Sequence, residues 1–408
     1  MRVHGETGRR GGTGRAADAA MPWAAARRAA RELGARSGPV PAVREPLAAA
    51  LDAALADDLI ARIPLPPFDA SAMDGYAVCG PGPWALRGQI LAGRPSDIDL
   101  RPGEAAEIAT GARVPTGTTA VLPYERSEVR DASLHGAIES GRHVRWRGEE
   151  LAEGSVVLPA GQTVTPAVLG LAASLAHDDL AVRRPRVAAF VSGDELVDDG
   201  VPAVGAVRDA IGPMLEGLVR WGGGTLASRE RIGDGFAAMV SALGGAAGAS
   251  VVVVCGASSA GPADHLRGAL AELGASVVVD GVRCRPGHPQ LLGHLGPPSA
   301  PGTLVVGLPG NPNAALVAAL TLLVPLLRAL AGRPPADPGL AAGCLVEGDV
   351  RPHERDTRLV AVRVEQGRAR PVGHDGPAVL RGAALADAFA VIPPDWRGPD
   401  ARLMWLPR

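Results

Sequence analysis

The sequence predicts a multidomain protein of the α/β plus β class. Its 408 residues exceed what a single hydrophobic core usually organises, so about two to four domains are expected. From Val187 onward, continuous apolar runs alternate with helical patterns, which is typical of a mostly parallel sheet between two helical layers. Short β-type runs broken by Gly and Pro occupy residues 82–147. The sequence therefore predicts a three-layer α/β domain accompanied by smaller β-rich domains.

Composition and charge exclude several classes of function. Apolar residues make up 47% and charged residues 21% of the chain, as in a globular protein. The net charge of −2 favours neither nucleic acid nor an anionic membrane as a partner. An aromatic content of 3% argues against stacking on single-stranded nucleic acid. The longest apolar stretch, Ala314 to Leu327, contains Pro325 and is interpreted as too short for a transmembrane helix.

The cysteines and the N-terminal segment indicate a cytoplasmic protein. The four cysteines lie far apart and form no C-x-x-C pair, so we expect neither a zinc site nor a disulfide framework, and a reducing compartment fits better. Residues 1–20 are rich in Arg and Gly and lack the apolar segment of a signal peptide. We interpret them as a disordered tail, with Met21 as a candidate start.

The N-terminal half is predicted to begin with two helices. The first covers Ala24 to Leu33, and the second covers Pro46 to Ile60, where leucines recur every four residues on one helical face. The proline-rich segment from Pro64 to Asp69 is expected to be extended. Strands of a small β-rich domain are expected at Ala105–Ala109 and Ala120–Tyr124.

The second half is predicted to alternate strands and helices. The expected strands are Val187–Val191, Val251–Cys255, Val277–Val279 and Thr303–Leu308, and the expected helices are Pro213–Val219, Phe236–Leu243, Ala263–Leu273 and Ala314–Leu330. Residues 332–339 are rich in Pro and are predicted to form a linker. Arg358–Val364 alternates in polarity, which predicts a strand in a separate C-terminal β domain.

Polar residues follow the predicted strands of the α/β domain. Ligands of an open parallel sheet bind beyond the carboxyl ends of its strands. These ends carry Ser192-Gly193-Asp194-Glu195, the glycine- and serine-rich turn 256–261 with Asp264 behind it, and Pro309-Gly310-Asn311-Pro312. The sequence thus predicts a ligand site at this edge of the sheet, although many parallel sheets have such turns without binding anything.

The segment from Pro309 to Pro312 has the clearest physical logic. Gly310 would allow a ligand to approach the backbone, Asn311 is a candidate helix cap, and Pro312 suits the first helical position. Free backbone amides at that helix start would hold phosphate or another oxyanion. The alternative interpretation is a well-capped helix that binds no ligand.

Three carboxylates near these strand ends suggest a bound cation. Carboxylates repel an anionic ligand unless a cation bridges the two, so Glu195, Asp209 and Asp264 together predict Mg²⁺ with oxygen ligands. Taken singly, each is more often a helix cap or a solvated charge. The metal hypothesis therefore depends on all three converging at one mouth of the domain.

Two stretches are too specific to be generic. They read Pro66-Pro67-Phe68-Asp69-Ala70-Ser71-Ala72-Met73-Asp74-Gly75-Tyr76-Ala77-Val78 and Glu107-Ile108-Ala109-Thr110-Gly111-Ala112-Arg113-Val114-Pro115. Others follow in order: Arg147-Gly148-Glu149-Glu150, Arg184-Pro185-Arg186-Val187, Pro286-Gly287-His288-Pro289, Leu308-Pro309-Gly310-Asn311-Pro312 and Gly373-His374-Asp375-Gly376. Over roughly residues 25–408, the chain resembles the molybdopterin molybdenumtransferase family, which includes bacterial MoeA and the catalytic E domain of gephyrin.

The resemblance implies an elongated, L-shaped subunit of four domains that forms a homodimer. A molybdopterin-binding α/β domain of the MoaB/Mog type would cover residues 183–332, and a β-rich lateral domain would cover residues 66–145. Residues 21–65 and 146–182 would form a linker and dimerisation domain, and residues 333–408 a small C-terminal β-barrel-like domain. The lateral domain of the other subunit would complete each active site.

The resemblance also implies an activity and the residues that perform it. The family inserts molybdenum from molybdate into adenylylated molybdopterin with Mg²⁺ and releases AMP; a molybdopterin adenylyltransferase and acceptor molybdoenzymes are the implied partners. The catalytic positions would be Asp74, Thr110, Glu150, Glu195 and Asp209, and the metal ligands Glu195, Asp209 and Asp264. The substrate-binding positions would be Ser192, Gly193, Gly256, Ser258, Ser259, Arg285, His288, Pro309, Gly310 and Asn311.

The chain departs from the family pattern at several of these positions. Glu150 replaces an aspartate, Ala210-Ile211 replaces Ser-Asn, Cys255-Gly256-Ala257 replaces Ser-Gly-Gly, Arg285 and His288 replace two lysines, and Pro377 replaces a serine. The chain contains no lysine, which accounts for Arg285, and arginine still binds oxyanions. His288 replaces a fixed charge by one that depends on pH; the alternative is a solvated loop residue.

Three functional hypotheses remain after these comparisons of motifs. An active molybdenumtransferase is supported by the retained acids Asp74, Glu195, Asp209 and Asp264. A catalytically impaired paralogue, which binds molybdopterin or its nucleotide as a carrier or regulatory protein, is supported by the altered positions. The third is a related pterin- or nucleotide-binding enzyme with another substrate, including tungstate in place of molybdate.

Overall fold

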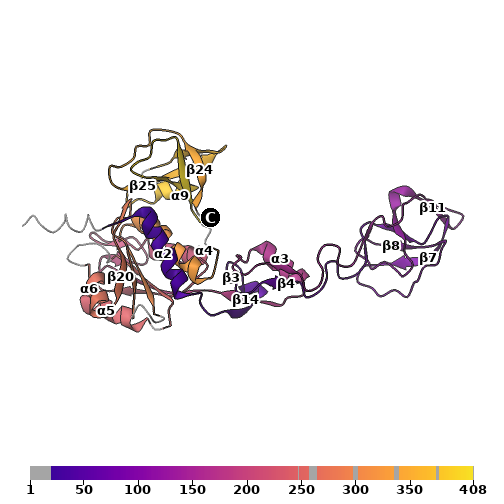
Figure 1. Cartoon of the computed structure of the whole chain (residues 1–408), viewed down its shortest axis with the longest axis horizontal. Helices are drawn as coiled ribbons and strands as arrows, with labels where there is room; N and C mark the ends of the chain where they lie inside the picture. Colours follow the sequence, from indigo (N-terminus) through magenta and orange to yellow (C-terminus); the bar gives the residue numbers. More distant parts are fainter. Residues whose placement is uncertain are drawn as a thin grey trace, which may run out of the picture.

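The computed structural model describes residues 20–246, 248–256, 264–296, 302–334, 340–373 and 376–407. The chain is elongated (Figure 1): an α/β domain and a C-terminal β domain lie at one end, a small linker domain follows, and a β-rich domain lies at the far end. The predicted multidomain α/β plus β fold is therefore confirmed. The predicted tail falls on residues 1–19, which lie outside the described part, and on Ala20.

The α/β domain is built on a six-stranded sheet with the order β18-β15-β19-β23-β22-β20. Its strands are β15 (Arg186–Ser192), β18 (Thr225–Ile232), β19 (Val251–Cys255), β20 (Ser276–Asp280), β22 (Leu291–His294) and β23 (Leu304–Leu308). The pairs from β18 to β23 are parallel, and β22 runs antiparallel to both of its neighbours. The predicted mostly parallel sheet is confirmed, and β18 and β22 are strands that the sequence pattern did not indicate.

Alternate residues of the central strands face two helical layers. Val187, Ala189 and Val191 belong to one buried cluster, whereas Ala188 and Phe190 belong to another, as the two-residue period of a strand requires. The helices over the first face are α2 (Trp23–Ser37), α4 (Gly212–Trp221), α7 (Pro312–Ala318), the π-helical segment η3 (Ala319–Leu323) and α8 (Val324–Leu330), and those over the second are α5 (Phe236–Gly245) and α6 (Leu266–Glu272). Helix α2, predicted within the linker domain, thus packs on the α/β core.

The longest apolar helix is a core element. The continuous helix from Pro312 to Leu330 has 19 residues and a mean hydropathy of 1.9, so by length and composition it is able to cross a membrane. The interpretation that this segment is too short for a transmembrane helix is therefore wrong. However, 89% of its 18-residue window is buried inside the protein, and the indole of Trp23 in α2 donates a 3.0 Å hydrogen bond to the Thr321 hydroxyl. A helix that is apolar all round is typical of a protein core.

The predicted helix from Pro46 to Ile60 is wrong. This segment forms short elements of the linker domain: β2 (Val43–Pro46), η1 (Leu47–Ala49), β3 (Ala54–Leu55) and β4 (Leu59–Ile60). They pair with β14 (Asp179–Arg183) and β13 (Val156–Leu158), and α3 (Pro166–Ser174) completes the domain. Leu55 and Leu59 are buried in its core beside Val182. Strand partners about 96 residues or more away along the chain overrode the local leucine pattern.

The lateral domain at the far end contains a six-stranded sheet with the order β10-β11-β7-β8-β6-β9. Its elements are β5 (Ala70–Ser71), β6 (Gly75–Val78), β7 (Trp84–Ile90), β8 (Glu104–Ile108), β9 (Ala120–Pro123), η2 (Tyr124–Arg126), β10 (Ser127–Arg130), β11 (Ser133–Gly136) and β12 (Val144–Arg145). The strands predicted at Ala105–Ala109 and Ala120–Tyr124 are confirmed to within one residue at each end.

The C-terminal domain is a closed barrel of five strands. Its elements are β24 (Leu340–Val346), β25 (Thr357–Glu365), β26 (Arg368–Pro371), α9 (Arg381–Leu385), β27 (Ala388–Ile392) and β28 (Asp400–Trp405), and pairing of β25 with β27 closes the barrel. Two strands from elsewhere extend this sheet: β21 (Val282–Arg285) pairs with β25, and β1 (Met21–Pro22) pairs with β21. Strand β21 therefore joins the barrel to the α/β domain.

Candidate active site

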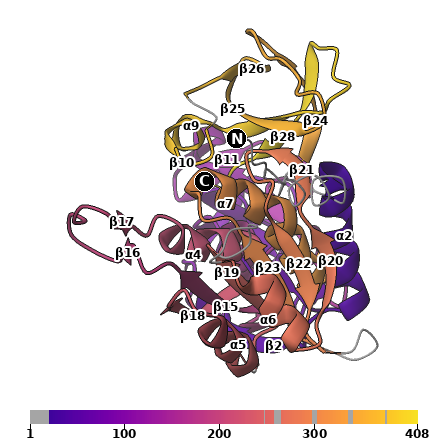
Figure 2. The same cartoon turned by 90° about the vertical axis from the view of Figure 1, so that its left-hand side faces the viewer.

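A cavity of about 710 Å³ opens at the carboxyl ends of β15, β19 and β23. The short strands β16 (Leu196–Val197) and β17 (Val207–Arg208) border it on a loop that projects from the α/β domain (Figure 2). Eight residues that the sequence indicated line it together: Ser192, Gly193, Glu195, Asp209, Gly256, Pro309, Gly310 and Asn311. We call this cavity the acidic basin, because Glu195, Asp209 and Asp234 line it.

Asp234 is an acidic-basin residue that the sequence pattern did not indicate. Its Oδ1 accepts a 2.7 Å hydrogen bond from the Ser192 hydroxyl, and its Oδ2 accepts one of 3.2 Å from the backbone N–H of Asp194. Asp234 follows β18, whose charged run Arg229–Arg231 hides the strand. One feature of the sequence could have identified Asp234: it lies between two glycines, and glycine-rich turns commonly follow the end of a strand.

Asp209 connects the acidic basin to the start of α4. Its side chain is buried, and its Oδ1 accepts hydrogen bonds of 2.9 Å from the backbone N–H groups of both Ile211 and Gly212. The carboxylate therefore satisfies two amides at the start of α4. Burial, with a smaller contribution from Asp209, raises the pKa of the Cys255 thiol at the end of β19.

Gly256 is required by the close packing of two strand ends. Its φ of +96° lies in the left-handed region, and an added Cβ would stand 2.5 Å from the carbonyl oxygen of Ser192. No side chain fits at that distance, because the obstacle is backbone. The floor of the acidic basin is therefore formed by backbone atoms at this point.

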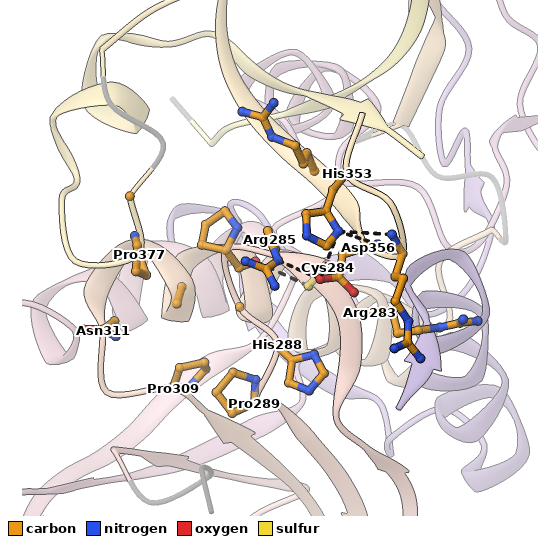
Figure 3. A pocket seen from close by; sticks show the side chains of 16 residues that line it. Arg283, Cys284, Arg285, His288, Pro289, Pro309, Asn311, His353, Asp356 and Pro377 are labelled. Carbon is orange, nitrogen blue, oxygen red and sulfur yellow. Dashed lines mark hydrogen bonds and ion pairs between the residues drawn. The ribbon is translucent and has the colours of Figure 1, made fainter. Parts of the chain in front are cut away.

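A second cavity of about 730 Å³ lies between the α/β domain and the C-terminal barrel (Figure 3). Among its described lining residues are four arginines, Arg283, Arg285, Arg355 and Arg358, but one carboxylate, Asp356. We call it the basic basin. His288 and His353 also line it. Its lining shares Pro289, Pro309 and Asn311 with the acidic basin, so the two basins are adjacent.

Arg285 and Asp356 form an ion pair in the wall of the basic basin. The Nε of Arg285, at the end of β21, donates a 2.7 Å hydrogen bond to Oδ2 of Asp356, which precedes β25. The Asp356 side chain is 12% exposed, whereas that of Arg285 is 63% exposed. His353 Nδ1 lies 3.5 Å from the same Asp356 oxygen. Figure 3 shows these three side chains grouped on one wall of the cavity.

The amides at the start of α7 are not free, contrary to expectation. The backbone N–H groups of Asn313 and Ala314 donate to the carbonyl oxygen of Pro377 at 2.9 and 3.1 Å, and Ala315 N–H donates to Asn311. Asn311 occupies the position before the helix but makes no side-chain capping bond. The predicted Asn311 cap and the predicted oxyanion site on these amides are therefore wrong, because a barrel loop satisfies the helix start.

The three predicted metal ligands do not form a closed metal site. Glu195 and Asp209 line the acidic basin, but Asp264 is not among its described lining residues. Within the described parts of the chain, no group of three or more His, Cys, Asp or Glu side chains is arranged to hold a metal ion. The predicted convergence of all three acids is therefore not met. The predicted substrate residues Ser258 and Ser259 lie outside the described residues.

The lateral domain, which contains Asp74 and Thr110, lies at the opposite end of the chain from the α/β domain and the barrel (Figure 1). The backbone N–H of Thr110 donates a 2.8 Å hydrogen bond to Oδ1 of Asp74. Beside them, the Tyr124 hydroxyl donates a 2.6 Å hydrogen bond to Oε1 of Glu107, which raises the pKa of Tyr124 to about 12. Glu150 is exposed where the lateral and linker domains meet, and its N–H donates to Leu65.

Family comparisons match almost the whole chain. The MoeA N-terminal region (domain I and II) matches residues 21–176, a probable molybdopterin binding domain matches residues 188–329, and the MoeA C-terminal region (domain IV) matches residues 346–399. Molybdopterin molybdenumtransferase 2 of Mycobacterium tuberculosis H37Rv is 34% identical over 371 residues, which are 86% of this chain and 90% of that protein. The chain belongs to the molybdopterin molybdenumtransferase (MoeA) family.

Other relatives and solved structures agree with this family. Molybdopterin molybdenumtransferase of Bacillus subtilis is 30% identical over 374 residues, which are 85% of each chain. A crystal structure of a molybdopterin biosynthesis MoeA protein from Pyrococcus horikoshii superposes with a TM-score of 0.72 at 25% identity, over 95% of this chain and 99% of that chain. A crystal structure of a molybdopterin biosynthesis MoeA protein from Pyrococcus horikoshii OT3 superposes with a TM-score of 0.75 at 20% identity, over 95% of this chain and 100% of that chain, which supports the fold.

Several departures from the MoeA family pattern have physical reasons. Ile211 is 6% exposed and packs in the core cluster with Leu215 of α4, so an apolar residue suits that position. Arg285 has a dedicated carboxylate partner. Pro377 contributes its carbonyl oxygen to α7, which needs neither a hydroxyl nor an N–H. Ala257 lies outside the described residues, and nothing in the structure explains His288.

Proposed function

We propose that this chain inserts molybdenum from molybdate into adenylylated molybdopterin and releases AMP. One observation carries the proposal: the acidic basin and the basic basin meet at Pro289, Pro309 and Asn311. The pterin nucleotide would occupy the first and the oxyanion the second. Two bound reactants that meet at a shared wall react without the entropic cost of a bimolecular encounter.

The basic basin suits molybdate. This small tetrahedral dianion would lie among Arg283, Arg285, Arg355 and Arg358, which outnumber the single described carboxylate, Asp356. Guanidinium groups present paired N–H donors that match oxyanions. His288 also lines this cavity. Tungstate has the same shape and charge, and we propose that it competes for the same cavity.

The acidic basin suits the phosphates of the nucleotide only with a cation present. Mg²⁺ is usually held by one or two carboxylates together with waters and substrate phosphates. Glu195 and Asp209 supply such an incomplete donor set, which fits a Mg²⁺ that also takes phosphate oxygens. When bound, Mg²⁺ would neutralise charge on the phosphates. Gly193 and Gly256 allow the substrate to approach the backbone, and the Ser192 hydroxyl is held in place by Asp234.

The lateral domain would act on the basins of a second subunit. Asp74 and Thr110 belong to the lateral domain, at the opposite end of the elongated chain from the α/β domain that contains Glu195 (Figure 1), so one subunit does not bring them together. We propose a cytoplasmic homodimer in which each lateral domain completes the partner's site. The substrate would come from a molybdopterin adenylyltransferase, and the product would pass to molybdoenzymes.

AMP release provides the test. The purified protein receives adenylylated molybdopterin, Mg²⁺ and molybdate, and AMP is followed by chromatography. AMP release that requires both molybdate and protein is expected. Tight binding of adenylylated molybdopterin without molybdate-dependent AMP release would overturn the proposal.

A second candidate, a carrier of molybdopterin without catalysis, is favoured by one contact. The Pro377 carbonyl occupies the amides of Asn313 and Ala314, so a barrel loop takes donors that a substrate anion would otherwise use. The same assay separates the candidates, because a carrier would bind the nucleotide and release no AMP.

A further inference from the structure

One wall of the basic basin contains a contact between two domains. Arg285 belongs to β21, and Asp356 lies immediately before β25 of the barrel. These strands pair in parallel, with Cys284 opposite Thr357 and Arg285 opposite Arg358. The 2.7 Å hydrogen bond from Arg285 Nε to Asp356 Oδ2 therefore spans the domain junction. The position of the Arg285 guanidinium depends on the barrel as well as on its own strand.

His353 holds the turn that presents Asp356. Its Nδ1 accepts hydrogen bonds from the backbone N–H groups of Arg355 and Asp356, at 3.2 and 3.1 Å. Both contacts are made by one ring nitrogen, so the His353 side chain is tied to the backbone of the two residues that precede β25. The His353 ring therefore fixes the backbone of Asp356, whose carboxylate accepts the hydrogen bond from Arg285. The turn from His353 to Asp356 thus acts as one unit.

We propose that Asp356, with its turn fixed by His353, is a positioning residue that aims Arg285 at the oxyanion in the basic basin. The carboxylate binds the Nε edge of the guanidinium, and the edge opposite Nε is directed away from it. The Arg285 side chain is 63% exposed and would otherwise sample several rotamers, whose restriction on binding costs affinity. This inference rests on the proposed function, because it names a residue that prepares the proposed molybdate cavity.

The geometry also gives Arg285 a role that lysine does not reproduce. A guanidinium has separate Nε and Nη donors in a rigid plane, so it binds a carboxylate with one edge and an oxyanion with another. A lysine ammonium is a single flexible point charge. The absence of lysine from the chain accounts for the residue type, but the Asp356 contact makes that type functional. We therefore expect Arg285→Lys to weaken oxyanion binding although the charge is retained.

Two neutral variants separate positioning from charge. Asp356→Asn and Asp356→Ala both remove the negative charge, but only asparagine retains an oxygen that accepts from Arg285 Nε. The dissociation constant of molybdate is measured by calorimetry for the full-length protein and both variants. We expect Asp356→Ala to bind molybdate about tenfold more weakly than Asp356→Asn. Equal affinities of the two variants would overturn the inference, because only charge would then matter.

The kinetic readout distinguishes positioning from a general loss of structure. Asp356→Ala should raise the KM for molybdate about tenfold and leave the KM for adenylylated molybdopterin within about twofold. A parallel rise of both KM values would contradict the inference. In a double-mutant cycle, Asp356→Ala should add little to Arg285→Ala, because Asp356 acts through Arg285; additive losses would also contradict the inference.

His353 supplies a matched pair of variants. The amide oxygen of asparagine stands near the position of a histidine Nδ1, so His353→Asn keeps an acceptor for the two backbone N–H groups, whereas His353→Ala keeps none. His353→Asn should bind molybdate within about threefold of the unmodified protein, and His353→Ala about tenfold more weakly. If the unmodified protein binds no molybdate, the proposed function fails instead. If the unmodified protein binds molybdate, but the Asn and Ala variants bind it equally well at both positions, this inference alone fails.

Discussion

The Ser192 hydroxyl donates a 2.7 Å hydrogen bond to Oδ1 of Asp234, which links the ends of two neighbouring strands. Ser192 ends β15 and is buried, whereas Asp234 follows β18 at the mouth of the acidic basin. The other Asp234 oxygen accepts from the Asp194 N–H, and Asp194 Oδ1 accepts from the Asp234 N–H. Three hydrogen bonds thus fix this wall of the basin.

Asp234→Ala should lower activity through Ser192. The change removes the acceptor of the Ser192 hydroxyl and one support of the following loop, so kcat/KM for adenylylated molybdopterin should fall about tenfold. The measurement is AMP release at several substrate concentrations. Ser192→Ala serves as the partner variant, and the double variant should be little worse than either single one. Full additivity of the two losses would show that the residues act independently.

Gly256→Ala should destabilise the α/β domain. The new Cβ would stand 2.5 Å from the Ser192 carbonyl oxygen, at a φ of +96°, and such backbone strain costs about 1–3 kcal/mol. Urea unfolding measures the loss. Gly244→Ala is the control, because Gly244 lies in α5 and an added Cβ there has no neighbour within 4 Å. That variant should be unchanged or stabilised by about 0.5–1 kcal/mol.

Tyr124 should ionise at unusually high pH. The chain has two tyrosines, so in a Tyr76→Phe variant the absorbance of tyrosinate reports Tyr124 alone. The hydrogen bond to Glu107 raises the Tyr124 pKa to about 12, above its ordinary value of about 10. Glu107→Ala in the same background should move the midpoint down toward the ordinary value. An unchanged midpoint would mean that Glu107 is not the cause.

The sign of the linked stability follows from the raised pKa of Tyr124. The folded protein favours the protonated phenol, so this contribution to folding is fully present below the ordinary pKa of about 10. It is lost as the pH rises through the folded-state pKa of about 12. Unfolding free energies of the Tyr76→Phe protein, with and without Glu107→Ala, should therefore converge at the alkaline end of that window.

Mixed dimers test whether Asp74 acts across subunits. Asp74→Ala and Glu195→Ala proteins should each be inactive. If the lateral domain completes the partner's basin, each mixed dimer contains one intact site of two, and random mixing in equal amounts restores about a quarter of the normal activity. If Asp74 acts within its own subunit, mixing restores none. Gel filtration before and after mixing establishes the dimers.

The local pattern of the sequence determined most of the α/β domain. Buried strands at Val187–Val191 and Val251–Cys255 are apolar without interruption, and the structure places them within one or two residues. Glycine- and serine-rich ends of these strands located Ser192, Gly193 and Gly256 at one edge of the sheet, because parallel strands end together. The spaced motifs identified the family, since they resemble its signatures over nearly the whole chain.

Tertiary structure alone decided the contacts that shape the basins. Ser192 with Asp234, Arg285 with Asp356, and the Pro377 carbonyl with α7 each join segments 42 to 71 residues apart. The first two pairs join neighbouring strands of a sheet, and no local period encodes which strands become neighbours. The same reason explains why Leu55 and Leu59 entered short strands instead of a helix. Contacts between segments distant in the sequence decided which polar groups face the basins and which already have a hydrogen-bond partner within the protein.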